Sequence, residues 1–141
     1  MIRHTESPSQ PFPGTVLLGV GSDPRQAALA RAEGADLIDV RAATPGALAA
    51  IRASLPAAVL WTGSPGDPLD ADRLAAAAAP DGAAERDGRA PAAVIATAAV
   101  CTWLGAPVVR SRHTRAVRRA IDMTASIAGR RPPSRTVRGL A

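Results

Sequence analysis

The chain alternates short apolar runs with segments that carry helix-start signals, and this alternation limits its fold more than any other feature. Asp23-Pro24 and Thr44-Pro45 each combine a capping side chain with a proline, which suits the first turn of a helix. Strands of about five residues that alternate with helices of about ten predict parallel βαβ units with right-handed crossovers. The four apolar runs of strand length are residues 15–20, 35–40, 57–61 and 107–110.

The segments between and after these runs predict helices at about residues 24–33, 44–54, 92–104 and 114–128. Residues 70–79 are also predicted to be helical, although their apolar pattern is weak. In the first, Ala28, Leu29 and Ala32 are expected to face inward. The fold class that follows is α/β, with about four parallel strands and their helices.

The chain of 141 residues has room for one domain. We expect a flexible N-terminal arm at 1–14, the α/β domain at 15–129 with an exposed loop at 80–91, and a basic C-terminal tail at 130–141. Cys101 is the only cysteine, so an intrachain disulfide is excluded. No apolar run is long enough to span a bilayer, and we expect a cytoplasmic protein without membrane contact.

The basic side chains are all arginine, 17 in number, which excludes any mechanism that needs a lysine amine. Nine of them lie between Arg110 and Arg138. This charge indicates either a solvated helix face with a basic tail, or a surface for an acidic partner or nucleic acid. No aromatic residues lie among these arginines, and no helix-turn-helix or zinc-ligand spacing occurs, which argues against specific recognition of nucleic acid.

Two stretches at opposite ends of the domain carry a more specific signal. The first reads Glu-Gly-Ala-Asp-Leu-Ile-Asp-Val over residues 33–40 and is followed by Thr44-Pro45-Gly46. The second reads Leu-Gly-Ala-Pro-Val-Val-Arg over residues 104–110, just before the last predicted helix. In this order they resemble dihydropteroate synthase, the pterin-binding (βα)8-barrel enzyme of folate synthesis. The resemblance covers residues 16–53 and 92–128, a little over half the chain.

The resemblance implies a shortened and degenerate member of that family, with a truncated (βα)8-barrel-like fold. A complete barrel needs about 250 residues, and the family's middle segment, with its pterin-holding Asp and Asn and its Ser-Arg-Lys, has no counterpart here. Arg41, Ala42 and Ala43 stand where the family has Gly-Glu-Ser. No catalytic or metal-ligating residue is therefore predicted, and Mg²⁺ is implied only if the family's activity is retained.

The resemblance also implies an anion site at the end of the last strand. Arg110 matches the family's arginine that grips the substrate diphosphate, Arg112 falls at the position of a family histidine, and His113 follows. Thr44 is a further candidate, because the start of a helix binds phosphate well. The alternative is a solvated helix start with Thr114 as its N-cap, and a plain capping role for Thr44.

Asp36 and Asp39 flank the two central residues of the second predicted strand. Their carboxylates are either ligands of a cation or acceptors of backbone hydrogen bonds at the ends of the strand. We favour the structural role.

Three functions are compatible with these observations. The first is a dihydropteroate-synthase-like protein that lacks most catalytic residues and either binds a pterin diphosphate or another phosphate ligand, or regulates a partner. The second is an active transferase that joins the pterin to p-aminobenzoate, and the third is an Arg-rich interaction protein. An incomplete barrel leaves two open sheet edges and an open apolar inner face, so we expect a homodimer or a complex with a full-length relative.

Overall fold

The computed structural model describes residues 14–64, 67, 69, 77–81 and 91–131. The predicted arm at 1–14 and the basic tail at 130–141 lie outside these ranges, except for Gly14, Arg130 and Arg131. None of the helices in the described ranges has the length and apolar character needed to cross a membrane.

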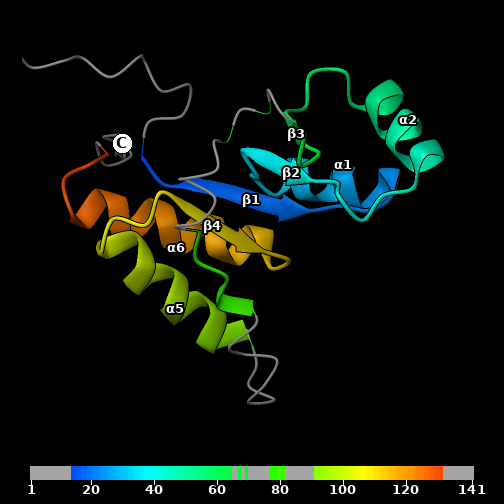
Figure 1. The fold of residues 1–141 in the computed structure, drawn as a ribbon. Coiled ribbons are helices and arrows are strands. Elements are labelled where there is room, and N and C mark those ends of the chain that lie inside the picture. Colours follow the sequence, from blue (N-terminus) through cyan, green and yellow to red (C-terminus); the bar gives the residue numbers. More distant parts are fainter. Residues whose placement is uncertain (1–13, 65–66, 68, 70–76, 82–90, 132–141) are drawn as a thin grey trace, which may run out of the picture.

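The strands in this part of the chain form a four-stranded parallel sheet, which confirms the predicted fold class (Figure 1). They are β1 (Val16–Val20), β2 (Leu37–Asp39), β3 (Leu60–Trp61) and β4 (Val108–Ser111), in the order β3-β2-β1-β4. The last of these strands pairs with the first, as the last strand does in a closed (βα)8 barrel.

The helices α1 (Pro24–Ala32), α2 (Pro45–Ser54), α5 (Pro91–Trp103) and α6 (Thr114–Ile127) alternate with these strands. Two of the predicted helix starts are confirmed by their caps. The Asp23 carboxylate accepts a hydrogen bond from the backbone N–H of Gln26 at 2.9 Å, and the Thr44 hydroxyl oxygen accepts one from the backbone N–H of Ala47 at 3.2 Å.

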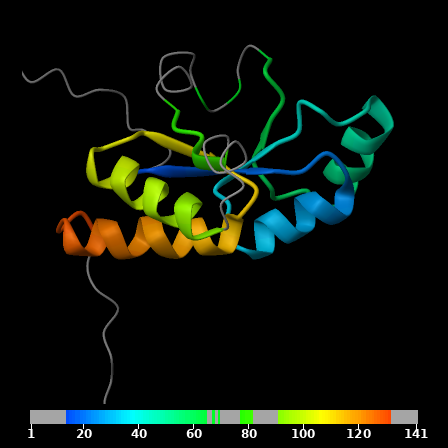
Figure 2. The same cartoon turned by 90° about the horizontal axis from the view of Figure 1, so that it is seen from below.

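Helices α1, α5 and α6 lie on one face of the sheet (Figure 2), and α2 packs through Ile51 in the same core cluster as Ile38 and Ala27 on that face. Leu17 and Val109 pack there against apolar residues of α5 and α6, and Ile38 packs against residues of α1 and α2. The register pairs Leu17 with Val109 and Gly19 with Ile38, so alternation along the strands puts these residues on one side. Helices on one face are typical of part of a barrel, whereas a doubly wound sheet has helices on both faces.

The opposite face of the sheet is also buried, although the sequence predicted an open inner face. Leu69, from the segment that follows β3, is 5% exposed and packs against this face. The strand residues that it helps to cover are Val16, Leu18, Leu37, Trp61 and Val108.

The outer edge of β4 is paired as well, which corrects the prediction of two open edges. The backbone N–H of Ala78 donates to the carbonyl of Val108 at 2.9 Å, and that of Arg110 donates to the carbonyl of Ala78 at 2.8 Å. This bridge also corrects the helix predicted at 70–79: residues 77–79 are not helical, and residues 70–76 lie outside the described ranges.

At the start of the predicted loop 80–91, Pro80 is buried and Asp81 is half-buried, while residues 82–90 lie outside the described ranges. The homodimer stays a prediction.

The predicted inward face of α1 is wrong. Ala27 and Ala30 are the buried residues of this helix, whereas Leu29 is 55% exposed. The reason is the close approach of α1 to β1: a Cβ on Gly21 would lie 2.7 Å from the Cα of Ala27, and one on Gly19 would lie 3.1 Å from the Cβ of Ala30. Only small side chains fit between a helix and a strand at this spacing.

Candidate anion-binding site at the carboxyl ends of the strands

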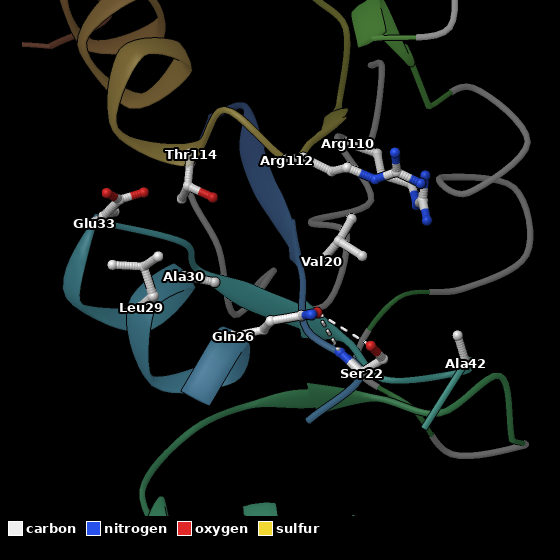
Figure 3. Close-up of a pocket in the computed structure, with 10 residues that line it drawn as sticks. All are labelled: Val20, Ser22, Gln26, Leu29, Ala30, Glu33, Ala42, Arg110, Arg112 and Thr114. Carbon is white, nitrogen blue, oxygen red and sulfur yellow. Dashed lines mark hydrogen bonds between the residues drawn. The ribbon is translucent and has the colours of Figure 1, made fainter. Parts of the chain in front are cut away.

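A pocket of about 460 Å³ lies at the carboxyl end of the sheet (Figure 3). The end of β1 contributes Val20 and Ser22 to its lining, and the end of β4 contributes Arg110 and Arg112. Helix α1 and the start of α6 complete the wall. The carboxyl ends of parallel strands are where α/β proteins bind their ligands, so this location agrees with a binding site.

Asp39, at the end of β2, organises the arginines beside this pocket. Its side chain is 3% exposed. One oxygen, Oδ1, accepts hydrogen bonds from the backbone N–H and the Nε of Arg41, both at 3.1 Å. The other, Oδ2, accepts from Nη2 of Arg41 at 3.0 Å and from Nε of Arg110 at 2.8 Å. Four hydrogen bonds therefore occupy the two oxygens of this carboxylate, which is about its full capacity.

The same contacts determine the charge of the cluster. Burial by itself raises the pKa of Asp39, but hydrogen bonds from the Arg41 and Arg110 side chains, the backbone N–H of Arg41 and the Arg41 charge outweigh it and hold this pKa below its usual value. The hydrogen bond to Asp39 also raises the pKa of Arg41. One carboxylate thus neutralises only one of the two guanidinium groups, and the cluster carries a net positive charge.

The guanidinium of Arg110 is held in place by a hydrogen bond from only one of its three nitrogens. Asp39 binds its Nε, and the two terminal nitrogens have no acceptor among the residues that the structure describes. The side chain is 35% exposed and lines the pocket. A fixed guanidinium with two free N–H edges suits a phosphate or carboxylate oxygen.

Asp81 fixes the turn that follows β4. Its carboxylate accepts hydrogen bonds at 2.6 Å from the hydroxyl of Ser111 and from the backbone N–H of Arg112. The Ser111 oxygen in turn accepts from the backbone N–H of His113 at 3.0 Å. The backbone that carries Arg110 and Arg112 is therefore anchored from a separate part of the chain.

The sequence-predicted site residues are brought together only in part. Arg110 and Arg112 both line the pocket. His113 occupies the cap position of α6, is exposed and does not line the pocket, and Thr44 caps α2 away from it. Thr114 is the first residue of α6 rather than its N-cap.

Asp36 and Asp39 both accept backbone hydrogen bonds, as the structural alternative predicted. Asp36 accepts from the N–H of Leu17 at 2.8 Å, and Asp39 accepts from that of Arg41. Within the described ranges there is no group of three or more His, Cys, Asp or Glu side chains placed to hold a metal ion.

The sequence did not predict the role of Asp39 as the anchor of Arg110. It placed Arg110 at the end of one predicted strand, 107–110, and Asp39 next to the end of another, 35–40, but only the strand register shows that their side chains lie on one face. Asp39 pairs with Val20 and Arg110 with Leu18, and residues two apart on a strand share a face. The contributions of Arg41 and Asp81 had no signal in the sequence, because neither lies in a regular position of a strand.

Three arginines that follow β4 in the described part of the chain, Arg118, Arg130 and Arg131, are bound within the molecule. Arg118 binds Asp36 at 3.0 Å and Asp122 at 2.8 Å, and Arg131 binds Asp122 at 2.8 Å. Arg130 donates to two carbonyls at the end of α5, at 2.7 and 2.9 Å. These arginines therefore stabilise the packing of α6 rather than forming an unpaired basic surface.

Comparison with known proteins gives a match to one short stretch. Over 47 residues, 33% of this chain, the sequence is 49% identical to proteins described as inactive dihydropteroate synthase 2 from Mycobacterium bovis and Mycobacterium tuberculosis. The match spans 15% of the length of these curated relatives. No family model matches the chain. No solved structure matches it either. The match supports a dihydropteroate-synthase-like relationship for part of the chain.

Proposed function

We propose that this protein is a non-catalytic, dihydropteroate-synthase-like protein that binds a phosphate or diphosphate ligand at the carboxyl ends of its strands. The observation that carries the proposal is Arg110. Its guanidinium is oriented by Asp39 through Nε and lines the pocket, and neither terminal nitrogen has an acceptor among the described residues. A pterin diphosphate fits this site chemically, and so does a simpler phosphate ester.

The absence of catalysis is supported by the state of Asp39. A carboxylate with four hydrogen bonds and a lowered pKa is a poor proton acceptor, and it has no oxygen left for a substrate ring. Arg41 makes three of those four hydrogen bonds, and its guanidinium carbon lies 3.8 Å from the centre of the Trp61 ring. The matched mycobacterial proteins are likewise described as inactive.

Calorimetric titration with inorganic diphosphate and with a dihydropterin diphosphate tests the proposal. We expect saturable binding by the wild type and at least a tenfold weaker affinity in Arg110→Ala, because a hydrogen bond to a charged group contributes about 1.5–3 kcal/mol. Arg119→Ala is the matched control. Arg119 is exposed on α6 and has no ion pair within residues 91–131.

Two results would contradict the proposal. Wild-type protein that binds neither ligand, or Arg110→Ala that binds both as tightly as the wild type, would remove the anion site. Formation of dihydropteroate from the pterin diphosphate and p-aminobenzoate by the purified chain would show that the protein is an enzyme.

A further inference from the structure

The face of the sheet opposite the helices, its inner face, has no second layer of strands to cover it. Parallel sheets are normally buried on both faces. The sheet of the described residues has four strands, which is half of the eight that enclose the interior of a complete barrel. The groups that cover the inner face therefore decide whether this fold needs a partner.

Asp67, which follows β3, ties the chain back to the end of that strand. Its Oδ2 accepts hydrogen bonds from the successive backbone N–H groups of Thr62, Gly63 and Ser64, at 2.9, 2.7 and 3.1 Å. Its Oδ1 accepts one from the Thr62 hydroxyl at 3.2 Å. Successive N–H groups that converge on one point form an anion-binding nest, and here a carboxylate of the same chain fills it. The first anchor of the cover is thus at the β3 edge of the sheet.

Leu69, two residues beyond Asp67, supplies the apolar part of the cover. It is 5% exposed and packs in a cluster with inward-facing residues of all four strands. Ala77 packs against the same cluster. Trp61, the largest side chain in the cluster, is 4% exposed. The inner face is therefore closed to solvent by side chains of this chain itself.

The second anchor lies at the opposite edge of the sheet. Ala78 pairs with the outer edge of β4, and the Asp81 carboxylate accepts hydrogen bonds at 2.6 Å from the Ser111 hydroxyl and the backbone N–H of Arg112. β3 and β4 are the outermost strands in the order β3-β2-β1-β4. The anchored residues thus occupy both the inner face and the edge of β4 to which a further strand would have to be added.

We propose that Asp67, Leu69 and residues 77–81 form an internal cover that occupies a surface on which a second copy of this chain would otherwise associate. A second copy fits the uncovered surface, because it would supply an equivalent apolar face and four further strands. A contact within one chain is favoured over the same contact between two chains, because its effective concentration is higher. The inference goes beyond the proposed anion-binding function and does not depend on it.

The test weakens the cover at two points and measures molecular mass by light scattering. Leu69→Ser removes the apolar side chain, and Asp67→Ala removes the acceptor of the three N–H groups. We expect the mass of each variant to approach twice the wild-type mass as concentration rises, whereas the wild-type mass stays constant. Leu55→Ser is the matched control, because Leu55 is partly buried in the cluster on the helix-covered face. Its mass is expected to stay at the wild-type value.

Trp61 reports whether the inner face itself is the surface that associates. Trp61 and Trp103 are the two tryptophans of the chain, and Trp103 is 54% exposed on α5. With Trp103→Phe as the background, the fluorescence therefore comes from Trp61. We expect acrylamide to quench it more strongly in dilute Leu69→Ser than in the background protein, and less strongly again once Leu69→Ser associates.

Several outcomes would overturn the inference. One is that folded Leu69→Ser and Asp67→Ala keep the wild-type mass at every concentration, and another is that the wild type associates as strongly as they do. Association of Leu55→Ser to the same extent, or a Trp61 that stays open to acrylamide in the associated form, would also overturn it. Circular dichroism verifies that each variant is folded. If Leu69→Ser does not fold, Asp67→Ala decides the test, because Asp67 is only half-buried.

Discussion

Asp36 and Asp39 lie three residues apart at the two ends of β2, and their carboxylates have different structural roles. Asp36 comes just before the strand, where it accepts the N–H of Leu17 at 2.8 Å and binds Arg118 at 3.0 Å. Asp39 ends the strand, where Arg41 and Arg110 bind it beside the pocket. The Asp36 side chain is 33% exposed, and that of Asp39 is 3% exposed.

The direction of the strand explains the difference. In a sheet of parallel strands, the carboxyl ends face the loops that hold ligands, and the amino ends face loops that mainly serve stability. Asp36 joins α6 to the amino end of the sheet through Arg118. Asp39 joins the carboxyl ends of β2 and β4 and so holds an arginine toward the pocket. Two identical side chains thus have a stabilising role and a site-building role.

The largest effect is expected at the carboxyl end. Asp39→Asn removes the charge that binds Arg41 and Arg110 and leaves two guanidinium groups close together. We expect the free energy of unfolding to fall by about 2 kcal/mol, less than for a fully buried pair because both arginines are partly exposed. Urea denaturation followed by circular dichroism measures it.

Asp23→Asn is the matched control for that substitution, because Asn caps a helix about as well as Asp. It is expected to change stability by no more than a few tenths of a kcal/mol. If Asp39→Asn and Asp23→Asn lowered the free energy of unfolding equally, the Asp39 cluster would contribute no more to stability than an ordinary surface contact.

A smaller effect is expected at the amino end. Asp36→Asn weakens the pair with Arg118 but keeps an oxygen that accepts the N–H of Leu17, and we expect a loss of about 1 kcal/mol. Diphosphate affinity should be unchanged, because Asp36 lies at the opposite end of the sheet from the pocket. If calorimetry showed that Asp36→Asn alters diphosphate affinity, the two ends of the sheet would not have separate roles in stability and binding.

The smallest effect is a dependence on pH. Because the folded-state pKa of Asp39 lies below its unfolded value, the unfolded chain takes up the proton first as pH falls. The stability that Asp39 contributes is present above about pH 4 and is lost as pH falls through the lower folded-state value. Urea denaturation at pH 6, 4 and 3 should therefore show that the free energy of unfolding falls less with decreasing pH in Asp39→Asn than in the wild type. Parallel profiles for the two proteins would contradict the role of the charge.

Much of the fold followed from local signals. The caps at Asp23 and Thr44 predicted two helix starts, and the apolar runs predicted four strands. The first three predicted strands are longer than the strands that form, and the fourth is shifted by one residue. Arg110 was placed correctly at the end of the last strand. Local periodicity did not predict that Leu29 is exposed beside the pocket, because the close contact of α1 with β1 selects alanines for the buried side.

The site itself was only half predictable. The nine arginines between Arg110 and Arg138 indicated an exposed helix face and a basic tail, either solvated or in contact with a partner, because only Asp122 lies among them in sequence. In the folded protein Arg110 meets Asp39 and Arg118 meets Asp36, partners that are 71 and 82 residues away. Pairings over such distances depend on the strand order, which sequence spacing does not encode.

The sequence by itself determined the elements: which residues begin helices, which form strands, and that the strands are parallel. Those features depend on interactions within a few residues, such as caps, turn glycines and side-chain alternation. Only the tertiary structure decided which carboxylate orients Arg110, which side chain covers the inner face, and that Thr114 faces a pocket instead of capping its helix. Those outcomes depend on β4 pairing with β1 and on α6 packing against β1, which bring together residues that are far apart in the chain.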